Sequence, residues 1–351
     1  MRLATKVKPS FADGPEYPHA NAPSPAGLHE VAPGVYWLRM PLPFALDHIN
    51  LWLLADGDGW TIVDCGFGGD LTRDLWRRIF ASHLGGRPVT RIIVTHFHPD
   101  HFGLAAWLAQ EWEAPVLMSE PEFASAQAWD AGRDPFTREG VFALFRQHGL
   151  RFGADEKLLP RETLFRRGAP DIPAQIVPLT DCQVLQIDGR AWRVVSGYGH
   201  SPEHAALCCD GLGVLIAGDM VLPRISTNVS VQPNLPDAAP LGMFLDSLTR
   251  HAQCEAGTLV LPSHGLPFYG LRERVKMLHR HHAARLDELL RACDEPRTGA
   301  EAMRVLFKRA LDSHQTLFAM GETLSHLNYL FRRGQLERAS GADGIYRFTR
   351  S

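Results

Sequence analysis

Short apolar runs separated by turn residues dominate the first part of the chain. The run INLWLLA (49–55) is followed by DGDG and then by WTIVDCG (60–66), a pattern typical of a β-hairpin. Apolar residues at helical spacing follow in DLTRDLWRRIFASHL (70–84), and VTRIIVTH (89–96) returns to a buried strand. The same alternation continues to residue 119. Strands therefore alternate with helices, which predicts a fold of the α/β or α+β class.

The alternation stops between residues 120 and 173 and resumes after that segment. Segment 120–173 is aromatic, charged and helical in its spacing, so we interpret it as a helical insertion. The halves on either side are weakly similar: a hairpin ends at Asp64 in the first and at Asp219 in the second. Each hairpin is followed by a strand that ends in histidine, His96 or His264. This repetition indicates two sheets, each flanked by helices.

The pattern changes again after a long charged helix predicted at 272–294. Two helical stretches (300–312 and 321–334) and two short strands joined by the turn SGADG follow. This order is typical of a small winged-helix domain. The prediction is an N-terminal arm (1–30), a main domain (31–295) and a winged-helix-like domain (296–351).

Composition limits the classes of protein that remain. The chain has 351 residues, 45% of them hydrophobic and 21% charged, as expected for a folded protein. The formal net charge of −3 provides no global basic field for nucleic acid or an anionic membrane. The six scattered cysteines form no C-x-x-C pair, and neither a secretory signal nor an apolar run of membrane-spanning length is present. We therefore expect a cytoplasmic protein with no membrane partner.

The C-terminal segment is locally basic. From residue 297 onward it carries nine Lys and Arg residues against five acidic residues. A DNA-reading helix would be expected to begin with basic or amide side chains, but the second predicted helix begins with Glu322. A packing role or a homodimer contact is therefore favoured over contact with nucleic acid.

The segment RIIVTHFHPDHFGLA (91–105) places several potential metal ligands in one strand-to-helix turn. These residues are His96, His98, Asp100 and His101. Two imidazoles spaced i and i+2 can grip one ion, while an adjacent carboxylate and imidazole can face a second. Three more candidates, each after an apolar extended run, are His200, Asp219 and His264. Nitrogen and oxygen ligands of this kind suit zinc, manganese or iron.

The motifs THFHPDH, GHSPEH, AGD and SHG, in this order and preceded by IVDCG, resemble the metal signature of the metallo-β-lactamase superfamily. The resemblance extends over about residues 30 to 275. It implies an αββα sandwich with a binuclear site at the open edge between the sheets. It also implies a ligand set for each ion: His96, His98 and His200 for the first; Asp100, His101 and His264 for the second; Asp219 bridging them.

The resemblance further implies that Asp64 orients the first motif through hydrogen bonds. Cys65, Glu203 and Ser263 depart from residues that are common in the family, but none of these changes removes a ligand. Because Asp100 is present, two divalent ions are expected, with zinc first and iron or manganese as alternatives. A mononuclear iron dioxygenase with the same first motif is a further alternative.

The expected chemistry is hydrolysis by a hydroxide that bridges two ions about 3.5 to 4 Å apart, with Asp100 orienting it. We favour a small-molecule substrate, and thioesters of the glutathione or coenzyme A kind first, because glyoxalase-II-like motifs coincide with a winged-helix-like tail. Lactonase and phosphodiesterase activities are alternatives. From other classes, a nuclease that uses the C-terminal domain and a metal-dependent scaffold are the rivals.

Several weaker signals have simpler interpretations. His204 is either a structural hydrogen-bond partner within its loop or a residue that supports the site or touches substrate. The run HRHH (279–282) is typical of a solvated helix face. The loop 228–237 is expected to lie over the metals. Core packing should account for most insertion aromatics, with one or two of the candidates reaching the site. These candidates are Phe123, Trp129, Phe136, Phe142 and Phe145, together with Tyr198 and Tyr269 outside the insertion.

Overall fold

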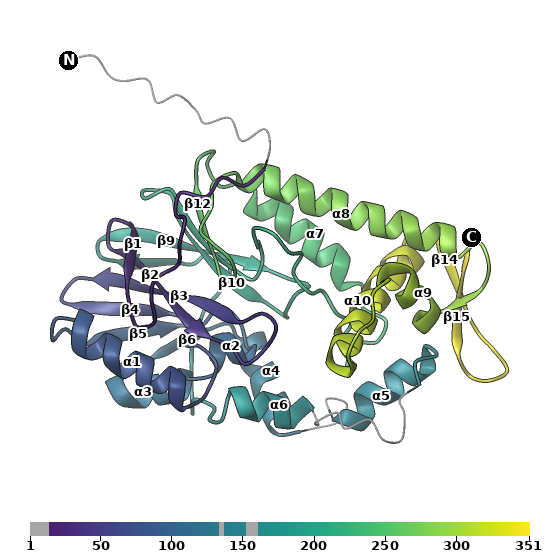
Figure 1. The fold of residues 1–351 in the computed structure, drawn as a ribbon, viewed down its shortest axis with the longest axis horizontal. Helices are drawn as coiled ribbons and strands as arrows, with labels where there is room; N and C mark the ends of the chain where they lie inside the picture. Colours follow the sequence, from purple (N-terminus) through teal and green to yellow (C-terminus); the bar gives the residue numbers. More distant parts are fainter. Residues whose placement is uncertain (1–13, 133–136, 152–160) are drawn as a thin grey trace, which may run out of the picture.

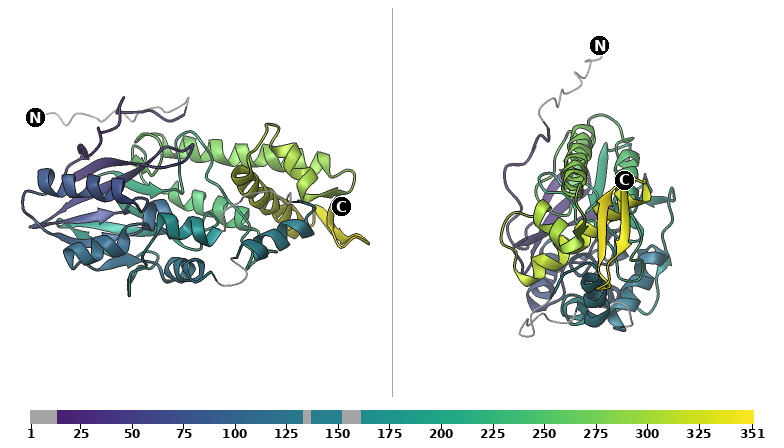
Figure 2. Two further views of the ribbon diagram at one scale, coloured as in Figure 1. Left: turned by 60° about the horizontal axis from the view of Figure 1, so that its bottom comes forward. Right: turned by 90° about the vertical axis from the view of Figure 1, so that its right-hand side faces the viewer.

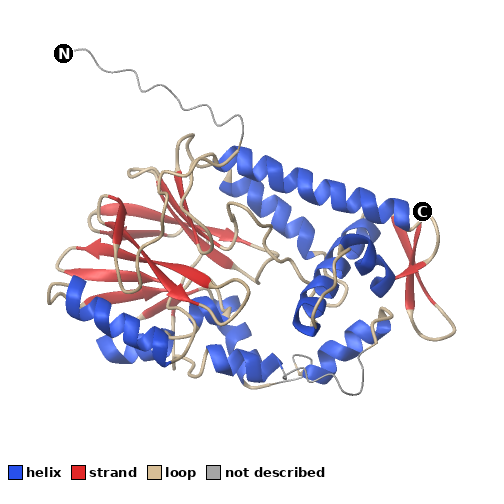
Figure 3. Cartoon of the chain, viewed as in Figure 1, coloured by secondary structure: helices blue, strands red, loops and turns tan. Residues whose placement is uncertain are grey.

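Two β-sheets packed face to face form the left-hand half of the molecule in Figures 1 and 3. The structure, a computed structural model, describes residues 14–132, 137–151 and 161–351. The first sheet has the order β1-β2-β3-β4-β5-β6-β7 and the second the order β12-β11-β10-β9-β8. The strands of the first sheet are β1 (His29–Ala32), β2 (Val35–Pro41), β3 (His48–Asp56), β4 (Gly59–Val63), β5 (Val89–Ile93), β6 (Val116–Met118) and β7 (Val177–Pro178). Those of the second are β8 (Val184–Ile187), β9 (Arg190–Gly197), β10 (His204–Cys209), β11 (Val214–Gly218) and β12 (Leu259–Pro262).

Helices cover the outer face of each sheet (Figures 1 and 2). Those on the first sheet are α1 (Asp70–His83), α3 (Ala105–Trp112), α4 (Glu120–Asp130) and α6 (Arg161–Gly168). Those on the second sheet are α7 (Pro240–His251) and α8 (Leu271–Ala292). Helix α1 packs because Leu75, Trp76 and Ile79 recur on one face and are buried there. The predicted αββα sandwich is confirmed.

The core between the sheets is built from alternate residues of facing strands. Trp37, Trp52 and Trp192 are each at most 1% exposed and lie within it. Each such ring removes a large apolar area from water, so this layer contributes strongly to the stability of the sandwich.

The strand directions bring the predicted ligand residues to one edge of the sandwich. In the first sheet β4 ends a hairpin and then pairs in parallel with β5, and β11 and β12 have the same relation in the second. The carboxyl ends of both parallel pairs therefore lead into turns that carry candidate ligands. Two contacts hold the sheets together there: the Ala205 N–H donates to the Thr95 carbonyl at 2.8 Å, and the Asn50 side chain donates to the Pro262 carbonyl at 2.8 Å.

The short helix α2 (Pro99–Phe102) lies in the first histidine turn, and the other elements gather at one end of the molecule (Figure 2). They are α5 (Arg138–Gln147), β13 (Arg297–Thr298), α9 (Gly299–Leu306), α10 (Ser313–Arg332), β14 (Leu336–Ser340) and β15 (Tyr346–Arg350). The three strands form a small sheet of order β13-β15-β14. Phe142 and Phe145 of α5 pack into the same apolar cluster as Leu324 of α10 and Phe348 of β15. The winged-helix assignment and the boundary at residue 296 stay predictions.

Three local expectations need correction. Helix α10 begins at Ser313 rather than 321, because Asp312 caps it. The Asp312 carboxylate accepts the Gln315 N–H at 2.7 Å, and the Gln315 side-chain oxygen accepts the Asp312 N–H. The preceding helix ends at Leu306 rather than 312. His282, predicted to lie on a solvated face, is fully buried because that side of α8 packs against α10.

Candidate metal centre

The seven predicted ligand residues lie together at the open edge of the sandwich. They form two groups that could each hold a metal ion: His96, His98, His200 and Asp219 in one, and Asp100, His101 and His264 in the other. Within each group the donor atoms lie within 4.8 Å of one another. Asp219 touches both, since its Oδ2 lies 3.3 Å from His200 Nε2 and its Oδ1 lies 3.3 Å from His264 Nε2.

Hydrogen bonds on the far side of the imidazole rings orient the donor atoms. His200 Nδ1 lies 2.8 Å from the Asn228 carbonyl, and His264 Nδ1 lies 2.8 Å from the His48 carbonyl. A carbonyl can only accept, so each of these Nδ1 atoms must carry the proton. In the neutral form of each ring, Nε2 then presents a lone pair to the interior of the site, as a metal ligand does.

The distances inside the first group fit a bound cation. His96 Nε2 lies 3.2 Å from His200 Nε2 and 2.9 Å from His98 Nδ1. Two nitrogens that share a tetrahedral zinc at about 2.0–2.1 Å are about 3.3 Å apart. Two imidazole nitrogens this close repel through their lone pairs unless a cation or a proton lies between them. The donor set thus fits a metal such as zinc.

Burial favours the neutral form of two imidazoles in the first group, His96 and His98. Burial, and then the neighbouring histidines, hold the pKa of His96 well below its ordinary value. Burial likewise lowers the pKa of His98 to about 3. A neutral imidazole has the free lone pair that metal binding requires.

The second group is rich in negative charge. Although burial opposes it, the carboxylates of Asp219 and Asp100 raise the pKa of His264 to about 10. Buried His101 Nε2 has no hydrogen-bond partner within the described part of the chain, and it lies 3.7 Å from Asp100 Oδ2 and 3.6 Å from Asp219 Oδ2. Buried carboxylates that converge on imidazoles favour positive charge between them, which a divalent ion supplies.

Asp64 holds the first histidine turn through hydrogen bonds. Its Oδ1 accepts the Thr95 N–H at 2.8 Å, and its Oδ2 lies 2.8 Å from His101 Nδ1. Asp64 adopts a left-handed backbone conformation with φ of 64°, which is uncommon for a residue other than glycine. Strain of this kind persists where the surroundings hold the side chain firmly, and here those surroundings are the turn that carries His96 and His101.

Glu122 joins the two main histidine turns and was missed by the sequence reasoning. It lies on α4, is 0% exposed, and accepts hydrogen bonds from the Phe97 N–H (3.0 Å), the Ser201 hydroxyl (2.6 Å) and the Glu203 N–H (2.7 Å). Burial raises the pKa of Glu122, and these three donors oppose the shift. One carboxylate thereby fixes the turns that carry His98 and His200. The sequence offers no local signal for it, because its partners are mostly backbone groups.

His204 holds the backbone of Asp219. Its Nε2 accepts the Asp219 N–H at 3.2 Å, and its ring centre lies 5.1 Å from that of His96. Gly218, with φ of 53°, permits this approach, because a Cβ there would lie 2.1 Å from His204 Nε2. His204 therefore supports the site through a structural hydrogen bond.

Aromatic rings flank the site on one side. Phe97 lies 4.9 Å from the ring of His98 and 6.5 Å from Trp129, so one insertion aromatic supports the wall of the site. The ring centre of Phe44 lies 5.4 Å from that of Phe67 and 6.3 Å from that of His314 on α10. These rings connect the loop after β2 with the C-terminal elements.

The other aromatic candidates make different contacts. Phe123 packs on the outer core of the first sheet, and Phe142 and Phe145 pack on the C-terminal core. The Tyr198 hydroxyl donates to Glu203 at 3.1 Å, Tyr269 packs against the core between the sheets, and Phe136 falls outside the described residues.

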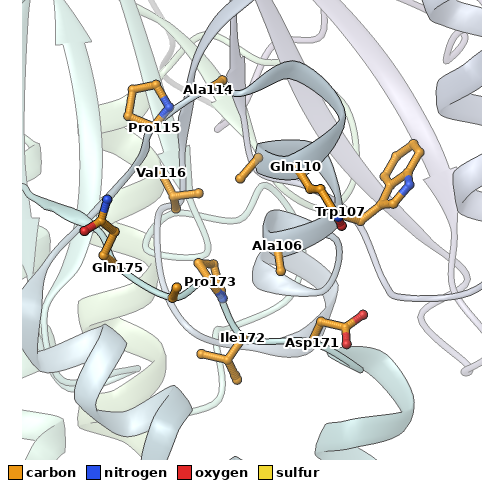
Figure 4. A pocket seen from close by; sticks show the side chains of 12 residues that line it. Ala106, Trp107, Gln110, Ala114, Pro115, Val116, Asp171, Ile172, Pro173 and Gln175 are labelled. Carbon is orange, nitrogen blue, oxygen red and sulfur yellow. The ribbon is translucent and has the colours of Figure 1, made fainter.

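Figure 4 shows a hollow of about 500 Å³ whose lining includes none of the predicted metal ligands. Trp107, Gln110, Asp171 and Gln175 are among the residues that line it, near the amino end of β6. The predicted ligands follow the carboxyl ends of strands, so the hollow is at the opposite edge. It is not the candidate metal centre.

The fold and the site together define a metallo-hydrolase of the metallo-β-lactamase type. The sequence matches the Metallo-beta-lactamase superfamily over residues 45–264, and a further family, "Metallo-beta-lactamase-like, C-terminal domain", over residues 286–351. The chain belongs to the metallo-β-lactamase superfamily. No helix in the described part of the chain is long and apolar enough to cross a membrane.

Solved structures and a curated relative agree with this placement. A beta-lactamase domain protein from Burkholderia ambifaria is 46% identical, with a TM-score of 0.88, over 96% of this chain and 97% of that one. A metallo-beta-lactamase family protein from Thermus thermophilus is 33% identical, with a TM-score of 0.78, over 92% of this chain and 100% of that one. A curated relative from Bacillus subtilis, "Probable metallo-hydrolase YqjP", is 26% identical over 84% of this chain and 91% of its own.

Proposed function

We propose that the protein is a binuclear metal-dependent hydrolase of a small carbonyl substrate, with a thioester of the glutathione or coenzyme A type as the first candidate. The observation that carries the proposal is the pair of donor groups that share Asp219. Two bound divalent ions would supply Lewis acidity and an activated water at this edge. Zinc is proposed first, and iron or manganese are the alternatives.

The protein side chains have separate roles in this proposal. His96, His98 and His200 would hold one ion, and Asp100, His101 and His264 the other, with Asp219 between them. Asp100 is the candidate catalytic residue: its Oδ2 lies 3.5 Å from His264 Nε2, so its carboxylate faces the donor groups and can orient a proton there.

The choice of substrate rests on the glyoxalase-II-like sequence motifs together with the winged-helix-like tail. Lactone and phosphodiester substrates remain the alternatives. All six cysteines lie within the described residues and are free, which fits the proposed cytoplasmic location.

A nucleic-acid substrate has less support, because most basic side chains of the C-terminal segment contact their own chain. Arg332 and Arg338 both bind Asp237, through its carbonyl at 2.8 Å and its carboxylate at 2.6 Å. Arg347 pairs with Asp343 at 2.8 Å, and Arg350 with Asp294 at 3.3 Å. Fewer cations are therefore left for phosphates. We propose a small molecule as the partner, with a homodimer as an open option.

The proposal is tested by a substrate screen of metal-reconstituted protein. Thioesters, lactones, phosphodiesters and β-lactams are compared, with His96→Ala and Asp219→Ala as matched blanks. We expect thioester turnover that falls by at least about a hundredfold in both blanks, because each variant loses a ligand. Turnover that is equal in the blanks would show that this site does not carry the reaction.

A further inference from the structure

Helix α10 reaches the loop that supports His200. The Asn228 side chain donates from Nδ2 to Glu322 Oε2 at 3.2 Å, and the Val231 N–H donates to the Gly321 carbonyl at 3.1 Å. The approach is close, because a Cβ on Gly321 would lie 2.7 Å from Ser230 Oγ. The loop is therefore attached to α10 by backbone, by side chain and by packing.

The same loop residue orients a metal ligand. The Asn228 carbonyl accepts the proton of His200 Nδ1 at 2.8 Å, while the Asn228 Oδ1 accepts the Ser230 hydroxyl at 2.7 Å. Both ends of the Asn228 side-chain amide are thus engaged, one of them by Glu322. A shift of Asn228 would move the carbonyl that fixes the ring of His200.

Helix α10 is itself held firmly, so it can act as a fixed support. The Asn328 side chain donates to the carbonyls of Pro236 (2.9 Å) and Ala238 (2.8 Å), at the far end of the same loop. His326 Nδ1 lies 2.8 Å from the Glu322 carbonyl, and its Nε2 lies 3.1 Å from His282 Nδ1 on α8. Both ends of the loop are tied to this helix.

We propose that Glu322 is a positioning residue of the metal centre: through Asn228 it fixes the orientation of His200, so the C-terminal helix forms part of the support of the metal site. This inference rests on the proposed function, because it takes His200 as a metal ligand. Contacts one step removed from a metal typically change metal affinity by 10- to 100-fold when they are lost.

The surroundings of Glu322 agree with a dedicated contact. Burial raises the pKa of Glu322 to about 7, while the bond from Asn228 and the charge of Arg285 oppose that shift. Either protonation state keeps a carbonyl-type oxygen that can accept from Asn228 Nδ2. The contact is therefore expected to survive titration of the carboxyl.

The test compares Glu322→Ala with Glu322→Gln and with Glu337→Ala, which removes an exposed carboxylate from β14. Zinc affinity is measured by competition with a chromophoric chelator, and the visible spectrum of the cobalt-substituted protein reports ligand geometry. Glu322→Ala should bind zinc about tenfold more weakly and show an altered cobalt spectrum. Glu322→Gln keeps an acceptor oxygen and should match the wild type, as should Glu337→Ala.

A second variant removes the donor of the hydrogen bond between Asn228 and Glu322. Asn228→Ala removes the Nδ2 donor but keeps the backbone carbonyl that His200 uses, and it should reproduce the loss seen in Glu322→Ala. Wild-type affinity and spectrum in a folded Glu322→Ala or a folded Asn228→Ala protein would overturn the inference. His96→Ala separates failure of this inference from failure of the proposed function. If His96→Ala binds zinc as tightly as the wild type does, the assignment of the metal centre is wrong.

Discussion

At the scale of single residues, the candidate ligands of the metal centre could be predicted from the sequence, but the residues that hold them in place by hydrogen bonds could not. His96, His98 and Asp100 stand together in one motif, so their chemistry could be predicted from spacing. Glu122 and Asn228 could not, because they act on backbone groups or on turns far away along the chain. Most glutamates on helices are exposed to solvent, so the sequence does not show that Glu122 is buried, whereas the folded structure does.

Glu122 yields a prediction about stability and metal binding. In Glu122→Ala the Phe97 N–H, the Ser201 hydroxyl and the Glu203 N–H lose their acceptor inside the protein. Each unsatisfied buried group costs about 1–3 kcal/mol, so we expect a loss of several kcal/mol in the free energy of unfolding, measured in urea.

Zinc affinity should fall with Glu122→Ala as well, because the variant frees both histidine turns. Glu120→Ala, an exposed neighbour on the same helix, is the control and should change neither quantity. A Glu122→Ala protein with wild-type stability and zinc affinity would show that the carboxylate does not hold the turns.

At the scale of elements, the insertion serves two parts of the molecule. Helices α4 and α6 cover the first sheet beside the ligand turns, whereas α5 packs on the C-terminal core. Apolar periodicity predicted helices here, but it could not show which core each would join. The early start of α10 has a similar cause: its Asp312 capping box is local, but the long apolar face depends on packing against α5 and α9.

The packing of α5 yields a prediction about acid stability. His148, just after α5, is 2% exposed and stacks on Phe348 of β15 with ring centres 5.8 Å apart. Burial, and then the charge of Arg338, lower the pKa of His148 to about 4. The unfolded chain binds this proton near pH 6.5, so the contribution to stability is complete above about pH 6.5 and is lost as the pH falls toward 4.

The variant His148→Phe tests this contribution. It removes the titrating group and keeps an aromatic ring, so its unfolding free energy should decline less between pH 6.5 and pH 4.5 than that of the wild type. Chemical denaturation at both pH values measures the difference. Equal declines would show that folding does not lower the pKa of His148.

At the scale of the whole molecule, candidate ligand residues that are far apart along the chain lie together at the open edge of the sandwich. The symmetry of two hairpins, each followed by a parallel strand, was visible in the sequence, and it explains why the αββα fold could be predicted. The sequence did not show that the C-terminal region reaches the same edge, since the contact of Glu322 with Asn228 joins residues 94 positions apart. Both parts of the chain therefore contact the loop that carries Asn228, beside the candidate metal centre.

The most direct test of the account is the metal content of the purified protein, measured by inductively coupled plasma mass spectrometry before and after reconstitution. We expect two equivalents of metal per chain after reconstitution, one for each donor group, and a loss of metal in Asp219→Ala, which removes the shared carboxylate. Less than one equivalent in the wild type, with no gain on addition of zinc, manganese or iron, would contradict the binuclear metal centre.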